Sequence, residues 1–193
     1  DLADYAQQVV EHPCQQESYP WDPMVDYAAM KRNTEDFMSL WRCSKPTIAK
    51  VHGYAVAGGS DIALSCDLLI MAEDAKIGYM PTRVWGCPTT AMWTFRLGFA
   101  RAKQLMFTGD VIDGTTAAEW GLANEAVPQE KLEAATMKLA ERIAGVPKSH
   151  LAMHKLVVNQ VMLTMGLEQT QMLATLFDGI TRHNPEGLWF RRY

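Results

Sequence analysis

The hydrophobic pattern predicts a long amphipathic helix near the start of the chain. Upstream of it, residues 3–10 predict a short helix, and residues 11–23, a mixture of prolines and polar side chains, predict a surface loop. Pro46 ends the long helix, because proline cannot continue it. The apolar positions that mark one face of this helix are Met24, Tyr27, Met30, Phe37, Met38 and Trp41.

The next stretch has the pattern of an α/β unit. Residues 47–54 (TIAKVHGY) predict a strand, and residues 58–65 (GGSDIALS) predict a short helix that is entered through glycines. Residues 68–72 (LLIMA) form a continuous apolar run, which is typical of a strand covered on both faces. The order strand, turn, helix, strand favours the α/β class.

Beyond Thr89 the pattern is helical, and only residues 123–127 resemble a strand. We therefore expect an α/β core over residues 1–128 and a helical portion over residues 129–193, whose many apolar side chains favour subunit packing. The predicted helices are 89–97, 100–107, 114–120, 129–144, 149–162 and 166–181.

Composition and charge narrow the class of protein. The chain has 193 residues, of which 48% are hydrophobic and 21% charged, as in one soluble globular domain. The net charge is −4, whereas proteins that bind nucleic acid or anionic lipid usually have a basic surface, so the sequence disfavours both classes of ligand. No apolar stretch approaches the roughly 18 residues of a membrane span, and the first residues do not form a signal peptide. These features predict a cytoplasmic protein with neither a nucleic-acid nor a membrane partner.

No metal site is expected. The four cysteines are not grouped as CxxC or CxxH, which disfavours a zinc cluster or a disulfide framework. His150 and His154 share a helical face, but no acidic residue accompanies them in an HExxH arrangement. We therefore interpret His150 and His154 as residues that face solvent or a partner and do not bind a metal.

The turn at Ala57, Gly58 and Gly59 is the first candidate for chemistry. Small residues let the backbone turn sharply after a strand and let a ligand approach closely. The following helix then directs unpaired N–H groups and the positive end of its dipole at this turn, as in an anion or oxyanion site. The alternative is that the glycines only permit tight packing. The nucleotide motifs GxGxxG and GxxxxGK[ST] are both absent.

Two segments carry a resemblance to a known family. VHGYAVAGGSDIALSCDLLIMAEDAKIGYMP, followed by RLGFARAKQLMFTGDVIDGTTAAEWGLANEAVP, resembles the signature of the enoyl-CoA hydratase/isomerase, or crotonase, family. The resemblance implies a crotonase-like β-β-α superhelix that acts on an acyl-CoA thioester and assembles as a homotrimer or a hexamer. It implies no separate cofactor, because coenzyme A arrives as part of the substrate.

The resemblance also implies an oxyanion hole for the thioester carbonyl. Two backbone N–H groups would favour the enolate over the neutral thioester, and one of them falls on Gly58. The other belongs to an A-G-x-D stretch, whose end resembles Asp1 and Leu2. Its alanine would stand three residues before Asp1, so that donor and the family's first strands are expected to be absent from this chain.

The acid–base residues of the family are only partly matched. The first of two glutamates falls on Asp61, and the second falls on Thr82, after Pro81. Because threonine does not ionise in the useful range, a one-carboxylate double-bond shift makes fewer demands than water addition by two carboxylates. Asp61 has the alternative role of stabilising a helix dipole, and Thr82 that of lining the pocket.

The remaining candidates surround the same site. Ala57 and Gly59, together with Tyr79, Pro81, Arg83 and Trp85, are expected to bind substrate or shape the acyl pocket. For Tyr79, Arg83 and Trp85, ordinary packing or surface exposure is an equally good explanation. The open alternatives for function are a CoA-thioester hydrolase, a carbon–carbon bond enzyme of the same family, or a catalytically silent acyl-CoA-binding subunit.

Three further positions have structural interpretations. Asp67 is expected to make a buried structural hydrogen bond at a strand entrance. The Thr89 hydroxyl is expected to cap a helix that starts at Thr90. Arg191 and Arg192 are expected to lie in a solvated tail, with contact to the coenzyme A of a neighbouring subunit as the alternative.

Overall fold

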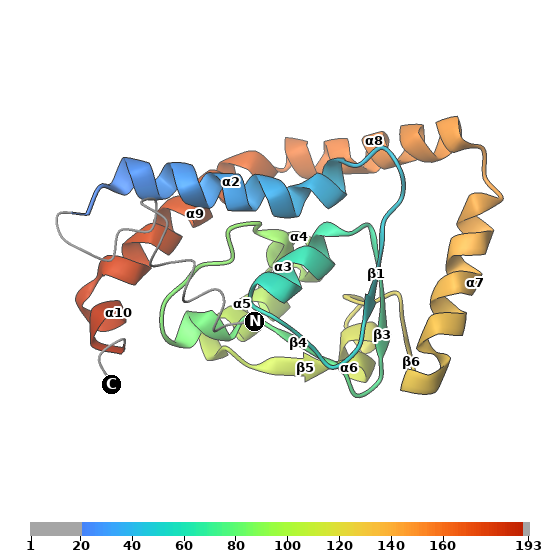
Figure 1. The fold of residues 1–193 in the computed structure, drawn as a ribbon, viewed down its shortest axis with the longest axis horizontal. Helices are drawn as coiled ribbons and strands as arrows, with labels where there is room; N and C mark the ends of the chain where they lie inside the picture. Colours follow the sequence, from blue (N-terminus) through green and yellow to red (C-terminus); the bar gives the residue numbers. More distant parts are fainter. Residues whose placement is uncertain (1–20, 191–193) are drawn as a thin grey trace.

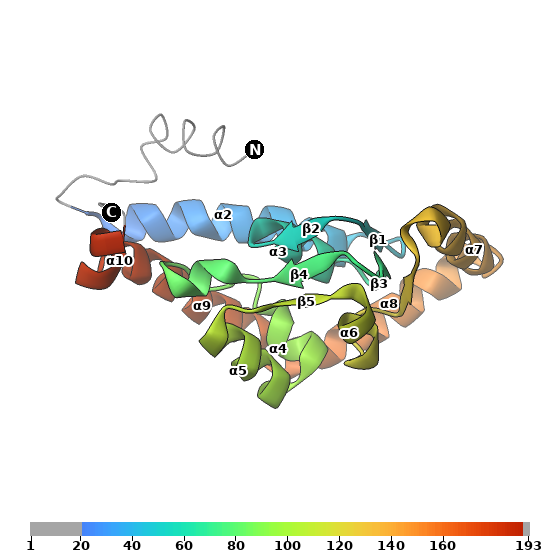
Figure 2. The ribbon, with the colours of Figure 1, turned by 90° about the horizontal axis from the view of Figure 1, so that it is seen from below.

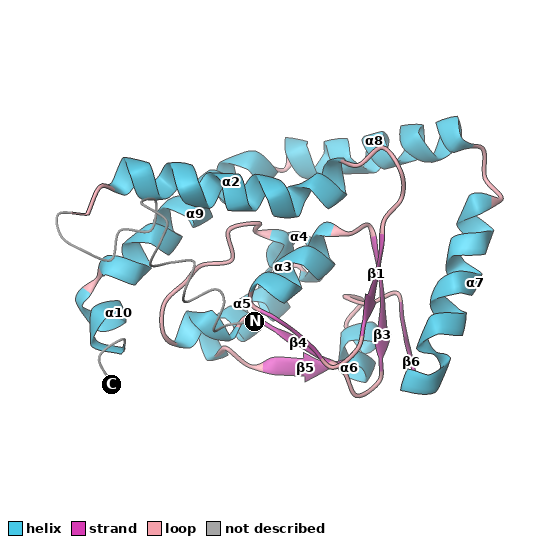
Figure 3. Cartoon of the chain, viewed as in Figure 1, coloured by secondary structure: helices cyan, strands magenta, loops and turns pink. Residues whose placement is uncertain are grey.

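The computed structural model describes residues 21–190. The predicted helix over residues 3–10, most of the predicted loop over 11–23, and the interpretations of Asp1, Leu2, Arg191 and Arg192 lie outside these residues. The structure is mixed α/β, with strands gathered toward one end and helices around them (Figure 3).

The long predicted helix is confirmed. Helix α2 covers Pro23–Arg42, and its N-cap is Asp22, whose carboxylate accepts hydrogen bonds from the Met24 and Val25 N–H groups. Its buried face differs in part from the apolar pattern, because it includes Asp26 and Thr34, whereas Met24 is 69% exposed. Helix α9 (Leu167–His183) packs beside α2, and its Arg182 pairs with Asp26, whereas the Thr34 hydroxyl donates to the Met30 carbonyl within α2.

The predicted strand over residues 47–54 is two strands. Strand β1 (Ile48–Val51) ends before Gly53, which has a positive φ of 62°, and β2 (Tyr54–Val56) then begins in a different sheet. Glycine takes this conformation without the steric cost that a side chain would add. The chain therefore passes from one sheet to the other at this bend.

In the described part of the chain, residues 21–190, six strands form two small sheets. One sheet has the order β1-β3-β6 with all strands parallel, and β3 (Leu68–Ala72) lies in its centre, buried as predicted. In the other, β2 pairs parallel with β4, and β4 pairs antiparallel with β5. The hydrophobic pattern misses β4 and β5, because three residues are too few to show alternation. The remaining strands are β4 (Lys76–Gly78), β5 (Val111–Asp113) and β6 (Glu125–Val127).

Helices cover the strands from two sides (Figure 2). Helices α2 and α3 lie on one side, and α4, α5 and α6 lie on the other. Between these layers, Leu69, Ile70, Met71 and Ile77 have at most 1% of their surface exposed. The bounds of these helices are α3 (Gly58–Ser65), α4 (Met92–Leu97), α5 (Phe99–Thr108) and α6 (Gly114–Glu119).

The C-terminal helices run along the edge and back across the molecule. Helix α7 packs against β1 and β3, and α8 returns toward α9 (Figure 1). These helices agree with the predicted ones, whereas α10 has no counterpart among them. The division of the chain at residue 128 stays a prediction. The bounds are α7 (Leu132–Ala144), α8 (Lys148–Thr164) and α10 (Pro185–Phe190).

The predicted cap at Thr89 is wrong. Helix α4 begins at Met92, and its N-cap is Ala91, which has a positive φ of 57° and no side-chain cap. Thr89 and Thr90 lie in a buried turn before it. The Thr90 hydroxyl is used elsewhere, on α3.

No helix within residues 21–190 is both long and apolar enough to cross a bilayer.

Candidate active site

A strained residue makes the turn from β2 into α3. The Ala57 N–H donates to the Gly78 carbonyl at 3.2 Å, which continues the strand pairing, and the backbone then turns at φ 51° and ψ −124°. A residue with a side chain held in such a conformation costs about 1–3 kcal/mol, and such strain clusters at active sites. The positive φ is thus carried by Ala57, and not by the two glycines after it.

The first turn of α3 has backbone N–H groups that the helix itself does not use. The Ser60 and Asp61 N–H groups donate to the Ala57 carbonyl at 2.9 and 3.1 Å, whereas those of Gly58 and Gly59, at the very start of the helix, have no intrahelical acceptor. A Cβ placed on Gly59 would meet no heavy atom within 4 Å, so this side of the turn is open. This geometry suits an anion or an oxyanion.

Asp61 lies in the same helical turn and is 4% exposed. Its Oδ1 accepts a hydrogen bond from the Thr90 hydroxyl at 2.5 Å. Burial raises the pKa of Asp61 to about 7, the negative charge of Asp178 adds to this rise, and the Thr90 hydrogen bond opposes it. Asp61 can therefore hold or release a proton near neutral pH.

The sequence reasoning missed three neighbours of Asp61. Thr90 was expected only as the start of a helix, and Asp178 lies more than one hundred residues further along the chain. Burial, and to a lesser extent Asp178 and Asp61, raise the pKa of Cys87 to about 11, so its thiol stays protonated. In the sequence, only the position of Asp61 in the family motif indicated this site. The interactions of Thr90, Asp178 and Cys87 with Asp61 form only when the chain folds, so local sequence does not reveal them.

Thr82 stands at the position of the family's second glutamate, and its hydroxyl is already engaged in a hydrogen bond. Thr82 lies in the short 3-10 helix η1 (Met80–Arg83), and its Oγ1 donates to the Met106 carbonyl of α5 at 2.7 Å. The hydroxyl proton is therefore used to join η1 to α5. A catalytic role for Thr82 stays a prediction that this bond does not favour.

The candidate pocket residues lie in different places: Tyr79 and Pro81 are near Gly86, whereas Arg83 contacts the α5–β5 turn. Tyr79 is 7% exposed, and its hydroxyl and Pro81 both lie beside Gly86, in the loop that leads to Thr90. The Arg83 guanidinium donates to the Thr108 carbonyl and pairs with Asp110, both at 2.7 Å, in the α5–β5 turn.

Trp85 is 40% exposed and follows η1 in the same loop. Substrate contacts of Tyr79, Pro81, Arg83 and Trp85 stay predictions.

Asp67 has the structural role expected of it. Its Oδ2 accepts hydrogen bonds from the Thr47 N–H at 2.7 Å, the Thr47 hydroxyl at 3.0 Å and the Lys155 ammonium at 2.7 Å. These bonds join the start of β1 and β3 to α8. Asp67 is thus excluded as a second free carboxylate for the site.

Within residues 21–190, no three His, Cys, Asp or Glu side chains form a group that could hold a metal ion. His150 and His154 are exposed on α8, in agreement with the interpretation as solvated or partner-facing.

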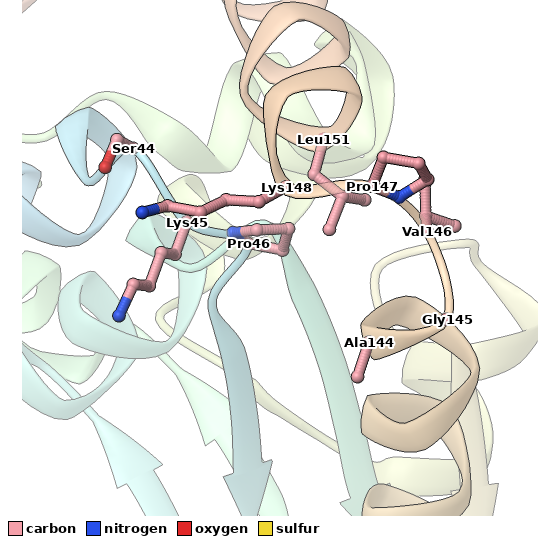
Figure 4. Close-up of a pocket in the computed structure, with 9 residues that line it drawn as sticks. All are labelled: Ser44, Lys45, Pro46, Ala144, Gly145, Val146, Pro147, Lys148 and Leu151. Carbon is pink, nitrogen blue, oxygen red and sulfur yellow. The ribbon is translucent and has the colours of Figure 1, made fainter.

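A hollow of about 500 Å³ lies away from this chemistry (Figure 4). It is formed where the α2–β1 connection faces the α7–α8 connection, and Asp61 does not contribute to it. Its lining residues are Ser44, Lys45, Pro46, Ala144, Gly145, Val146, Pro147, Lys148 and Leu151.

Comparison with known proteins decides the family. The sequence matches the family model described as Enoyl-CoA hydratase/isomerase over residues 15–189. This chain belongs to the enoyl-CoA hydratase/isomerase family. The resemblance found in the sequence motifs is therefore confirmed.

Solved structures of this family share the fold. An enoyl-CoA hydratase from Mycobacterium smegmatis is 55% identical, with a TM-score of 0.88 over 91% of this chain and 60% of that chain. An enoyl-CoA hydratase/isomerase from Xanthobacter autotrophicus is 26% identical, with a TM-score of 0.83 over 97% of this chain and 69% of that chain. The expected crotonase-like fold is confirmed.

A curated relative, the crotonyl-CoA hydratase of Syntrophomonas wolfei, is 37% identical over 132 residues. The match covers 66% of this chain and 50% of the relative. The chain spans about half the length of the curated relatives that it matches.

Proposed function

We propose that the protein is an acyl-CoA enzyme of the enoyl-CoA hydratase/isomerase type that stabilises the enolate of a thioester. The observation that carries this proposal is the Asp61 carboxyl, buried three residues beyond Gly58 and with a pKa raised to about 7. A base that deprotonates a carbon next to a carbonyl works best with a pKa near the working pH.

The Gly58 N–H is the proposed oxyanion donor within this chain. It stands at the N-terminus of α3, where the helix dipole favours negative charge, and the neighbouring Gly59 side of the turn is open. As the thioester loses a proton, negative charge grows on its oxygen, and a donor fixed in advance stabilises this charge more than the neutral carbonyl. The positive φ of Ala57 is the strained backbone conformation that accompanies this orientation of the Gly58 N–H.

Among the reactions of the family, we favour a double-bond shift. Asp61 in its carboxylate form takes a proton from C2 of a 3-enoyl thioester, and the electron pair of that C–H bond forms the dienolate. Asp61 then returns the proton to C4, which yields the 2-enoyl thioester and restores the carboxylate. One titrating group suffices for this sequence, and Thr82 supplies no second carboxylate.

Water addition is the second candidate, because relatives such as the Syntrophomonas wolfei protein are named as hydratases. It needs a second group, besides Asp61, that holds and polarises the water. The Thr90 hydroxyl does not supply that group, because it is fully buried and donates to Asp61 Oδ1.

We also propose a homotrimer or a hexamer. Apolar side chains on α8 are more than half exposed, including Leu156, Val157 and Val158, and such a surface favours packing against another subunit. Light scattering on the purified protein tests this: a monomer at micromolar concentration would contradict it. The cytoplasmic location and the lack of a nucleic-acid partner or a separate cofactor stay predictions.

The activity is tested with crotonyl-CoA and with longer 2-enoyl-CoA and 3-enoyl-CoA thioesters. Hydration and double-bond migration are followed separately, by chromatography and mass spectrometry of the products. We expect migration by the wild type and at least a hundredfold loss in Asp61→Asn with thioester binding retained. Asp74→Asn, the same change at an exposed position, is the matched control and should turn over normally.

Two results would contradict the proposal. Tight binding of thioesters without turnover of any would indicate a silent acyl-CoA-binding subunit. Unchanged turnover in Asp61→Asn would show that Asp61 is not the base.

A further inference from the structure

The loop whose last residues contact Asp61 is held by a helix from the far end of the chain. In this loop, which leads from η1 to α4 (green in Figure 1), the Gly86 N–H donates to the Thr181 hydroxyl oxygen at 3.0 Å. The next N–H group, that of Cys87, donates to Asp178 Oδ1, also at 3.0 Å. Both acceptors belong to α9. Two consecutive backbone groups of the loop are therefore fixed by one helix.

A third bond fixes the end of the loop. The Gln171 Nε2 of α9 donates to the Thr90 carbonyl at 2.9 Å, and Gln171 is only 7% exposed. The hydroxyl of the same threonine donates to Asp61 Oδ1. One residue thus joins α9, through its backbone, to the candidate base, through its side chain.

Helix α9 is itself fixed by buried charges. The Arg182 guanidinium pairs with Asp178 Oδ2 at 3.3 Å and with Asp26 Oδ1 of α2 at 2.8 Å. Gly179 leaves the space that the Asp26 carboxylate occupies, because a Cβ there would collide with it. A buried ion cluster of this kind contributes little net stability, since desolvation offsets its attraction. Its effect here is to fix where Asp178 stands.

We propose that α9 is the positioning element of the candidate active site: Gln171, Asp178 and Thr181 hold residues 86–90 so that the Thr90 hydroxyl donates to Asp61. These α9 residues act through the loop and need no contact with substrate. The catalytic consequence rests on the proposed function, whereas the positioning itself does not. The titratable groups that face Asp61 are Asp178 of α9 and Cys87 of the loop.

The decisive variant is Gln171→Met, which removes the donor to Thr90 and keeps an unbranched side chain. Gln171 borders a hollow of about 320 Å³ between α2 and α9, so methionine has room to settle. Gln169→Met is the matched control, because it makes the same change at an exposed position of the same helix. Thr181→Val, which removes the acceptor of the Gly86 N–H, is the second variant in case Gln171→Met does not fold.

The first measurement is independent of catalysis. Cys87 is half-buried with a raised pKa, so we expect it to react slowly with thiol reagents while the loop is held in place. We expect Gln171→Met to speed labelling of Cys87, followed by mass spectrometry of its peptide, on the order of tenfold or more. The control should label at the wild-type rate. Wild-type labelling rates in both Gln171→Met and Thr181→Val would overturn the proposal.

The second measurement is the pH profile of turnover. The Thr90 hydrogen bond favours the charged form of Asp61, so its loss should move the rising limb to higher pH, with KM little changed. Thr90→Val should give the same shift, and Thr90→Ser should restore the wild-type profile. A profile that stays in place in Thr90→Val would overturn the link to Asp61. If the wild type shows no turnover while Cys87 labelling responds as expected, the proposed function fails and the positioning stands.

Discussion

Replacing Asp61 by Asn should make the protein more stable at alkaline pH while it removes the candidate base. The folded protein keeps the Asp61 carboxyl almost out of contact with water, and its pKa rises from 3.8 to about 7. Ionising it in the fold therefore costs more than ionising it in the unfolded chain. Asparagine has nearly the same shape, still offers an oxygen to the Thr90 hydroxyl, and carries no charge at any pH.

The sign and the size follow from the two pKa values. The neutral carboxyl stabilises the fold fully below pH 3.8, and this contribution falls as the pH rises and is lost above about pH 7. A difference of roughly 3 pKa units corresponds to about 4 kcal/mol in total, of which about 3 kcal/mol falls between pH 5 and pH 8. The wild type should lose this free energy over that range relative to Asp61→Asn.

Urea denaturation of both proteins at several pH values between 5 and 8 measures the difference. Comparison with the variant cancels most of the titration of Asp178, whose pKa is also raised by burial. We expect the stability of Asp61→Asn relative to the wild type to grow steadily with pH. A relative stability that stays constant to within about 0.5 kcal/mol would refute the argument that Asp61 is buried and titrates near neutrality.

Three further substitutions probe other parts of the account. Thr82→Val removes the hydrogen bond to the Met106 carbonyl and should cost about 1 kcal/mol in urea denaturation while leaving the pH midpoint of turnover in place; a shifted midpoint would give Thr82 a part in proton transfer. Lys155→Met removes the ammonium that pairs with the Asp67 carboxylate and should cost about 3 kcal/mol with turnover per folded molecule retained, whereas a negligible cost would contradict a structural role for this pair. Ala57→Gly relieves a positive φ and should raise the free energy of unfolding by about 1 kcal/mol; a clear fall would show that the turn is not strained.

Helices and buried strands were predictable because their patterns are long. The apolar run over residues 68–72 and the helical spacing from Met24 onward each contain enough positions to show one period. Strands β4 and β5, with three residues each, do not. The split of residues 47–54 at Gly53 could not be seen either, because both halves have strand composition and only the change of sheet separates them.

The candidate site was predictable only where one short segment carries it. Gly58 and Asp61 lie three residues apart in one motif, and the structure places both in the first turn of α3. Local sequence predicted a sharp turn at Ala57, Gly58 and Gly59 without saying which residue would take the unusual conformation, and the structure places the positive φ on Ala57, the residue that leaves the strand. Thr90 and Asp178 escaped prediction because nothing in their local sequence indicates that folding brings them to Asp61.

Hydrogen exchange at the carbon next to the thioester carbonyl tests the central claim most directly. The purified protein is incubated with an acyl-CoA thioester in D₂O, and deuterium at C2 is measured by mass spectrometry. The account predicts exchange in the wild type and its loss in Asp61→Asn, with Asp74→Asn exchanging normally and all three proteins binding the thioester. Absence of exchange in the wild type, or exchange that survives in Asp61→Asn, would contradict the claim that this site forms an enolate with Asp61 as the base.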